Sequence, residues 1–573
     1  MRQTLLAPAG GALIGLAAVG IAERGTGSRP VLAVVVIALA VAAAVLPLRF
    51  GLGIAVVLAG FDGFIVDFVG YGARYWNEVF AALLIARSVV FARPTRRELV
   101  VAAAVALVLV GYLASGTSLK ADAWGLKVLG LWAVGGYGIY RLRPGLREWL
   151  GAYAGLATLT AASLVLEVWQ RSKGARGLEK LGLAYGERVR QISPSGSLRA
   201  FGGFTSAAPL SYALAIALAA WVGFLLCSPS DRRVAWRTCW LPPVAAIGMY
   251  LTVDRTAVLA LLAGLIVLAI AYRPAILLPA VALAAVLVGL GALAGIGSPF
   301  RHELGSSAKA RAALWDEYLA DLRPFGRGPA TAGSAYKKVA PEPPWVPPIR
   351  IPSRWDVTYS QIVARGVEQP VLGTYLPHLP PLVLSADARS LAGGSRFGIA
   401  SERGKTLLVR DLAAGVSEPI AVRVPASRKA VSRLTIGARP PVSLRNLRFA
   451  GLPPTRTPAE RIWQRWFDRT PAALQSDGPG LVDNLYVSWL WQYGLIGVVV
   501  CAVWLVVLLR PIWVPKTNPV AISAVLVGVF LVVAALAVNI WEEAPIDLLA
   551  AIVLAVAYSV GRATPTRAGR SAA

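Results

Sequence analysis

Three short segments bring together residue types that bind anions and exchange protons. The first carries Arg188, Arg190 and Arg199, the second is Asp254-Arg255, and the third is Asp483-Asn484-Leu485-Tyr486. Arg presents a planar fork of N–H donors that matches phosphate oxygens, and a carboxylate is ionised at neutral pH. Each segment precedes an apolar stretch, and all three fall on the same expected side of a membrane. They can therefore share one cavity.

Ionisable residues also occur inside the apolar stretches, where lipid penalises a charge. They are Asp62, Asp67, Glu78, Lys127 and Glu167. A charge at the bilayer midplane costs at least ~2.5 kcal/mol, so each of these side chains must face a polar cavity or a partner. Structural pairing accounts for the acids as well as a functional role does. Lys127, near the outer end of its stretch, is a candidate for contact with an anion.

The composition is that of a polytopic membrane protein. Hydrophobic residues make up 56% of the chain and the mean hydropathy is +0.62, whereas ordinary soluble domains are roughly 45–50% apolar. Runs of about 17–24 residues with few charges are each long enough to cross a ~30 Å hydrocarbon core as a helix. We expect about fourteen of them, at 4–22, 30–48, 51–69, 74–91, 98–115, 122–140, 148–168, 205–227, 236–253, 256–272, 275–296, 485–508, 519–540 and 545–561.

The distribution of basic residues predicts the orientation. The short loops of one parity hold nearly all the Lys and Arg residues, which marks them as cytoplasmic. Both termini are then cytoplasmic, and Trp541-Glu542-Glu543 lies outside. The first stretch could instead be a signal peptide, because Met1-Arg2 precedes an apolar run. Either way, the expected location is the cytoplasmic membrane.

The chain divides into three parts. A helical body (1–296) has an exported loop at about 169–203, an extracytoplasmic insert covers 297–484, and a final group of three helices with a cytoplasmic tail covers 485–573. The formal charge of +27 is spread over many loops, which argues against nucleic acid. The basic exported segments favour an anionic partner such as a membrane lipid or a lipid-linked phosphate. The three cysteines all lie in or beside membrane stretches, so the insert has no disulfide and no cysteine metal site.

The insert itself is composite. Its start has a helical pattern at about 308–322, and a Pro-rich extended linker follows at 341–352. Short β-type runs then recur every ~10 residues over about 370–450, which predicts a small sandwich-like β-domain. These runs are 381–385, 396–400, 406–410, 419–424, 432–437 and 442–449. A surface helix at 458–469, with Trp463 and Trp466, would lie on the membrane interface, stack on sugars or pack against the β-domain.

The predicted fold class is therefore an all-α polytopic membrane protein with an inserted extracytoplasmic, mostly-β domain. Four groups of short motifs together span about 199–497: Arg199–Pro209 before a helix, Asp254-Arg255-Thr256-Ala257, Trp315 with Pro324-Phe325-Gly326-Arg327-Gly328, and Asp483-Asn484-Leu485-Tyr486 followed by Tyr493-Gly494-Leu495-Ile496-Gly497. In these motifs the chain resembles the O-antigen ligase and O-antigen polymerase family of lipid-linked glycan transferases. The family commonly has His where this chain has Asp483.

The resemblance implies a transferase on the outer face that moves a glycan from a polyprenyl pyrophosphate to an acceptor hydroxyl of a glycan or lipid, without a nucleotide sugar, a metal or another cofactor. Arg199 and Arg255 would stabilise the departing pyrophosphate, with Lys127, Arg188 and Arg190 as further anion contacts. Asp483 would act as the base, although an Asp before a helix is also an ordinary N-cap. Asn484 and Tyr486 would orient the acceptor or the base. Asp254 is the reserve carboxylate, and pairing with Arg255 is its simpler role.

Two other function classes compete with this interpretation. A transporter or flippase of lipid-linked sugars would also bury charges, but transporters tend to show internal repeats, and this chain shows none. A scaffold that anchors a polymer-binding β-domain would not need so many helices with buried charges. Within the enzyme class, ligase and polymerase share the donor and differ only in the acceptor.

Overall fold

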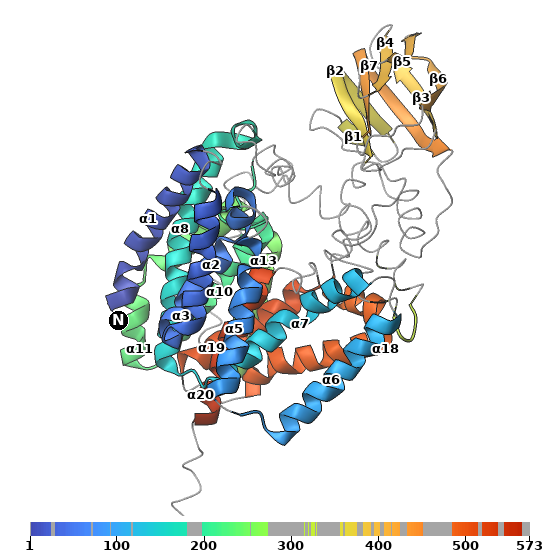
Figure 1. Ribbon diagram of the computed structural model, residues 1–573. Coiled ribbons are helices and arrows are strands. Elements are labelled where there is room, and N and C mark those ends of the chain that lie inside the picture. Colours follow the sequence, from blue (N-terminus) through green and yellow to red (C-terminus); the bar gives the residue numbers. More distant parts are fainter. Residues whose placement is uncertain are drawn as a thin grey trace, which may run out of the picture.

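Helix dominates the residues that the structure describes (Figure 1). The computed structural model describes 2–24, 29–69, 73–91, 93–115, 119–179, 198–252, 254–272, 315, 319, 322–326, 328, 356–358, 361–374, 382–390, 395–401, 406–413, 415–424, 432–450, 484–513, 518–536 and 544–563. The helices before the insert are α1 (Arg2–Arg24), α2 (Arg29–Val45), α3 (Leu48–Gly60), α4 (Asp62–Phe64), α5 (Trp76–Phe91), α6 (Arg96–Ser115), α7 (Leu119–Arg141), α8 (Leu146–Glu179), α10 (Ala207–Leu226), α11 (Pro229–Arg237), α12 (Leu241–Thr252) and α13 (Arg255–Tyr272). Those after it are α18 (Leu485–Leu509), α19 (Pro519–Ala534) and α20 (Ala544–Ala563).

Helices occupy every predicted membrane stretch except 275–296, which lies outside the described residues. Within the described part of the chain, four helical segments are long and apolar enough to cross a membrane: Leu6–Glu23, Leu146–Gly174, Ala207–Leu226 and Leu485–Trp513. Shorter apolar helices accompany them, including α12 and α19. These lengths and compositions indicate a membrane protein.

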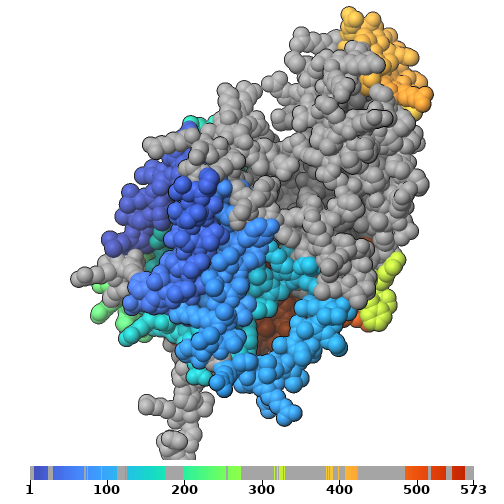
Figure 2. Space-filling model, in the orientation of Figure 1, coloured from blue at the N-terminus to red at the C-terminus, as the bar shows by residue number. Residues whose placement is uncertain are grey.

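The outer surface of the helical body is also apolar. On α6, Val101, Leu107 and Val110 are 62%, 76% and 61% exposed. Figure 2 shows the helices of the first part of the chain, coloured blue, covering one face of the body. Contiguous exposed apolar side chains are rare on monomeric soluble proteins, and here they fit contact with lipid.

Three predicted stretches differ from the observed helices. The stretch 51–69 is broken after Gly60, where α3 gives way to the short α4 and a π-helical turn, Ile65–Val69. The stretch 236–253 contains the end of α11 and the shorter α12, which are separated by turn residues. The stretch 148–168 ends too early, because α8 continues to Glu179 across a kink at Gly174. An apolar run reports lipid contact, but it does not report where the backbone breaks.

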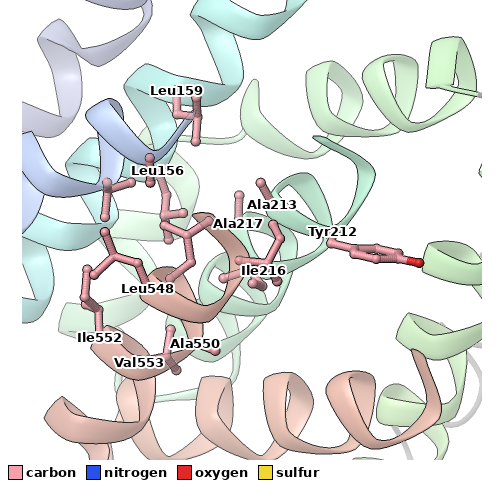
Figure 3. Packing of buried hydrophobic residues seen from close by; sticks show 14 of the residues in the cluster. Leu156, Leu159, Tyr212, Ala213, Ile216, Ala217, Leu548, Ala550, Ile552 and Val553 are labelled. Atoms are coloured by element: carbon pink, nitrogen blue, oxygen red, sulfur yellow. The ribbon is translucent and has the colours of Figure 1, made fainter. Parts of the chain in front are cut away.

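The core of the body is built around α19. Every residue of α19 from Pro519 to Leu531 is buried, as expected for a helix that is apolar on all sides. α19 packs against α10, α13, α18 and α20. Figure 3 shows the adjoining part of this core, where side chains of α8, α10 and α20 such as Leu156, Ile216 and Ile552 interlock.

Glycines allow α8 to approach α3 closely. A Cβ atom at Gly151 would overlap the Arg49 carbonyl oxygen, and one at Gly155 would lie 2.6 Å from the Gly53 carbonyl oxygen. Gly151 and Gly155 are four residues apart, so they lie on one face of α8. Small residues at this spacing let backbones pack together in membrane proteins.

The strands form one antiparallel sheet that Figure 1 shows apart from the helices. They are β1 (Asp356–Thr358), β2 (Gln361–Thr374), β3 (Leu382–Ser390), β4 (Ser395–Ser401), β5 (Thr406–Leu412), β6 (Ser417–Val424) and β7 (Ser432–Ala450). β2 pairs with one edge of β7. On the other edge, β4 pairs with the first half of β7 and β3 pairs with its second half.

The strand runs predicted from the sequence coincide with β3 to β7, but two of them, 432–437 and 442–449, are joined in the single strand β7. Pro440 and Pro441 lie between them, at the point where β7 passes from β4 to β3, and neither has a paired partner. Proline has no N–H to donate, so a position between two ladders is where a strand tolerates it. β2, β3 and β4 each pair with β7, and β1, β5 and β6 join the sheet through them. A sandwich-like arrangement stays a prediction.

We predict that Gly151→Ala weakens the packing of α8 against α3, because the added Cβ has no space beside the Arg49 carbonyl. Overpacking of this kind costs about 1–3 kcal/mol, so the unfolding temperature of the purified protein should fall by several degrees. Gly111→Ala is the matched control, since a Cβ there would meet nothing within 4 Å. Equal unfolding temperatures for the two variants would contradict the described interface.

Candidate functional site

Two of the three predicted segments meet at a loop, which we call the arginine loop (Leu198–Ser206). Gln170, buried on α8, holds it with three hydrogen bonds. Its side-chain oxygen accepts from the backbone N–H groups of Phe201 and Gly202, both at 3.0 Å, and its Nε2 donates to the Gly202 carbonyl at 2.8 Å. Gly202 has a φ of 55°, which a glycine adopts without steric cost. One glutamine thus fixes the turn that follows Arg199.

The arginine loop also fills the break after α3. The Phe64 N–H donates to the Gly203 carbonyl at 2.8 Å. A Cβ at Gly203 would lie 2.6 Å from the Gly60 carbonyl oxygen, and a Cβ at Gly63 would overlap the Phe204 backbone. The break in the third predicted stretch is therefore the place where the loop is seated.

Two arginines lie at the C-terminal end of α12. Arg199 Nε donates to the Thr252 carbonyl at 2.8 Å, and Arg171 Nη2 donates to the Leu251 carbonyl at 3.1 Å. The last carbonyls of a helix carry partial negative charge and favour cations. Both side chains are only partly buried, so their remaining N–H groups are suited to an anion.

Asp254, between α12 and α13, is the acidic member of the cluster. It is 8% exposed, and its carboxylate accepts from the Ser211 hydroxyl at 2.5 Å and from the Thr256 N–H at 3.0 Å. Burial raises the pKa of Asp254, while the Ser211 hydroxyl and the charge of Arg199 oppose that rise. The simpler role expected for Asp254 was pairing with Arg255, whose side chain lies outside the described residues.

The third segment begins α18, and its capping residue differs from the expectation. Asn484, not Asp483, is the N-cap, because its side-chain oxygen accepts from the N–H groups of Tyr486 and Val487 at 3.0 and 3.1 Å. The Asn484 amide donates to the Leu536 carbonyl at 3.2 Å, and the Tyr486 hydroxyl donates to the Val532 carbonyl at 3.0 Å. Both side chains thus attach α18 to the end of α19, and the orienting roles expected for them stay a prediction. Asp483 lies outside the described residues.

Two motifs that are far apart in the sequence contact each other further along α18. Gly494 kinks the helix with a φ of 56°, and the turn Arg323–Gly326 lies against the kink. The Leu495 N–H donates to the Pro324 carbonyl at 2.8 Å, and the Gly328 N–H donates to the Gln492 carbonyl at 3.0 Å. A Cβ on Gly494 would overlap the Pro324 carbonyl oxygen, so glycine is required there. Backbone groups released by the kink therefore hold a piece of the insert.

The start of α18 and the beginning of α10 both contact the C-terminal part of α19. The Leu485 N–H donates to the Ala535 carbonyl at 3.0 Å, beside the bonds of Asn484 and Tyr486. The ring of Tyr212, next to Ser211 on α10, lies edge-on to Phe530 of α19 with ring centroids 5.5 Å apart. The start of α18 and the Asp254 cluster thus lie at the same end of the helical body.

Lys127, the remaining predicted site residue that the structure describes, has partners on α5 and beside it. Lys127 on α7 forms an ion pair with Glu78 on α5 and lies 5.9 Å from the centre of the Tyr75 ring. Glu78 Oε1 takes part in this ion pair, whereas Glu78 Oε2 has no hydrogen-bond partner among the described residues. Asp62 accepts from Trp76 Nε1 at 2.9 Å. Structural contacts thus account for Lys127, for one oxygen of Glu78 and for Asp62. Arg188 and Arg190 lie outside the described residues, as does the side chain of Asp67.

Sequence reasoning missed Gln170, Arg171 and Ser211. The prediction ended the seventh stretch at 168, and this assigned Gln170 and Arg171 to a loop, although both lie on α8. Arg171 follows Glu167 by four residues, so the pair lies on one face of the helix, and this spacing was the signal available. No sequence signal pointed to Ser211, because a single Ser in an apolar helix is common.

Comparisons of the chain with family models, with curated proteins and with solved structures found no match.

We predict that Gln170→Leu loosens the arginine loop while the helical body stays folded. The change removes three hydrogen bonds to buried backbone groups of Phe201 and Gly202, at about 1–3 kcal/mol each. Hydrogen–deuterium exchange over 198–206 should rise at least tenfold. Thr160→Val is the control, because Thr160 is buried on the same helix and bonds only its own Leu156 carbonyl. Unchanged exchange over 198–206 in Gln170→Leu would contradict the role of Gln170 in holding the arginine loop.

Proposed function

We propose that this protein is a membrane glycosyltransferase that moves a glycan from a polyprenyl-pyrophosphate carrier to an acceptor hydroxyl on the outer face of the cytoplasmic membrane. Cell-envelope polysaccharide assembly is the setting in which such carriers are used. The proposal includes about fourteen spanning helices, cytoplasmic termini and an exported insert with its β-domain. Ligase and polymerase activity are both compatible with it.

The observation that carries the proposal is the meeting of separate segments at one end of the helical body. Arg199 and Asp254 lie together at the end of α12, and α10 and the start of α18 reach the same end of α19. The contact of the Arg323–Gly326 turn with Gly494 joins two more of the motifs named from the sequence. Motifs that act together are expected to converge in this way.

The residues suit the chemistry of glycan transfer. The acceptor oxygen forms a bond to the anomeric carbon while the bond from that carbon to the phosphate oxygen breaks. Polyprenyl pyrophosphate then leaves with the bonding electrons, and Arg199 and Arg255 stabilise its growing charge through charge-assisted hydrogen bonds. The hydroxyl proton passes to a carboxylate, for which Asp483 is our first choice and Asp254 the second.

The other predicted site residues have secondary roles in the proposed reaction. Arg188, Arg190 and Lys127 would contact the anionic donor or nearby membrane lipids. Asn484 and Tyr486 would support the site indirectly, because they fasten α18 to α19. No cofactor or metal is assigned to the reaction, since a pyrophosphate leaving group is already activated.

We expect the purified protein to release polyprenyl pyrophosphate from a lipid-linked oligosaccharide when an acceptor glycan is present. Arg199→Ala and Arg255→Ala should abolish this turnover, and Asp483→Asn should slow it by about 10²-fold or more, because general base catalysis is worth 10²–10⁴-fold. Lys173→Ala is the control, since Lys173 pairs with Glu23 away from the cluster. Saturable binding of the donor without any turnover would instead favour a transporter or flippase of lipid-linked sugars.

The proposed membrane topology can be tested separately by labelling exposed cysteines from one side of the membrane. Cys239 follows α11 and is exposed, whereas Cys227 and Cys501 are half-buried. In intact cells a membrane-impermeant maleimide should label Ala413→Cys, which lies in an exposed turn of the sheet, but should not label Cys239 until the membrane is permeabilised. Labelling of Cys239 from outside would reverse the proposed topology.

A further inference from the structure

Glu167 is a fully buried acid that the proposed reaction leaves without a role. It lies on α8 with no exposed surface, and neither carboxyl oxygen has a hydrogen-bond partner among the described residues. In the same described part of the chain, Ser163 Oγ and Arg171 Nε, one helical turn to either side, are also buried and unpartnered. Three polar groups at positions i−4, i and i+4 thus lie on one face of α8.

The carboxylate of Glu167 lies between α10 and α12. Its carboxylate faces Gly248 of α12, where a Cβ would lie 3.0 and 3.2 Å from the two oxygens and 2.7 Å from the Leu214 side chain of α10. α10 and α12 contain no charged residue, and their titratable groups are Tyr212 and Tyr250, of which Tyr250 is 51% exposed. On α1, Glu23 pairs with Lys173. The nearest cation along the helix is Arg171.

An ionised carboxylate in this place would lack both water and donors, which is costly. A protonated one is neutral. Arg171 is already engaged elsewhere, because it donates to the Leu251 carbonyl, one turn beyond Gly248 on α12. In that position it lies beside Arg199, which donates to the next carbonyl, so two guanidinium groups meet at this end of α12.

We propose that Glu167 is a proton-binding site that controls whether Arg171 is available to an anionic ligand. With the proton bound, Arg171 stays at the end of α12 and serves with Arg199 as a second cation for a pyrophosphate group. When the proton leaves, the carboxylate draws Arg171 back by one helical turn into an ion pair, and the site loses one charge. The ligand chemistry rests on the proposed function, but the switch is tested by binding alone.

The test measures binding of farnesyl pyrophosphate, a short polyprenyl pyrophosphate, to the full-length protein in nanodiscs at about pH 6 and about pH 9, on either side of the range where a buried carboxyl titrates. Glu167→Gln cannot lose a proton, so it should bind at about pH 9 at least ~10-fold more tightly than the wild type and match it at about pH 6. Both proteins are measured with the same probe at the same pH, so ionisation of the farnesyl pyrophosphate affects the two binding constants equally. Identical pH profiles for the two proteins would overturn the proposal.

Arg171 provides the second arm of the test. Arg171→Ala should weaken binding at about pH 6 by roughly tenfold, the size of one charge-assisted contact, and the double variant with Glu167→Gln should bind like Arg171→Ala at both pH values. Lys173→Ala should bind like the wild type. If Arg171→Ala binds as the wild type does, the assignment is wrong.

A direct chemical readout covers the case in which a variant fails to fold. Dicyclohexylcarbodiimide reacts with protonated carboxyl groups in apolar places, so mass spectrometry of the wild-type protein should find an adduct on Glu167 at about pH 6 and less at about pH 9. An unmodified Glu167 at both pH values would overturn the proposal. Absence of glycan transfer with these binding results intact would refute the proposed function and leave the switch standing.

Discussion

The structure depends on the burial of α19, a helix without a polar face. Every residue from Pro519 to Leu531 is covered by other helices, and α10, α13, α18 and α20 are the helices that pack against it. This burial requires segments from both sides of the insert to pack together. Its C-terminal end is also the point to which α10 and α18 bring the polar residues of the candidate site.

The candidate site is held mainly by backbone groups that helix breaks leave free. The end of α3 receives the Gly203 region of the arginine loop, the end of α12 receives Arg199 and Arg171, and the kink of α18 receives the turn Arg323–Gly326. In an apolar environment each unsatisfied N–H or C=O group is costly, so breaks attract partners. Positions of broken helix in this protein therefore coincide with the positions of its polar clusters.

The sequence predicted where helices lie better than how they end. Long apolar runs located α1, α10 and α18 because length and composition decide membrane insertion. They did not reveal the break after Gly60 or the extension of α8, since both depend on contacts with the arginine loop. The choice of Asn484 over Asp483 as cap was equally hidden, because both residues form N-caps readily. The importance of Gln170 appears only when its three backbone partners are in place.

The proline pair of β7 has a consequence for how the sheet meets other protein chains. β4 and β3 share one edge of β7 and leave a short gap between them, and Pro440 and Pro441 lie at that gap. Unpaired strand backbone is a template on which a foreign strand can add and begin aggregation. Two consecutive residues without N–H groups cannot donate the backbone hydrogen bonds that such a strand needs for pairing. The proline pair thus protects the sheet against intermolecular strand addition at the gap between β4 and β3.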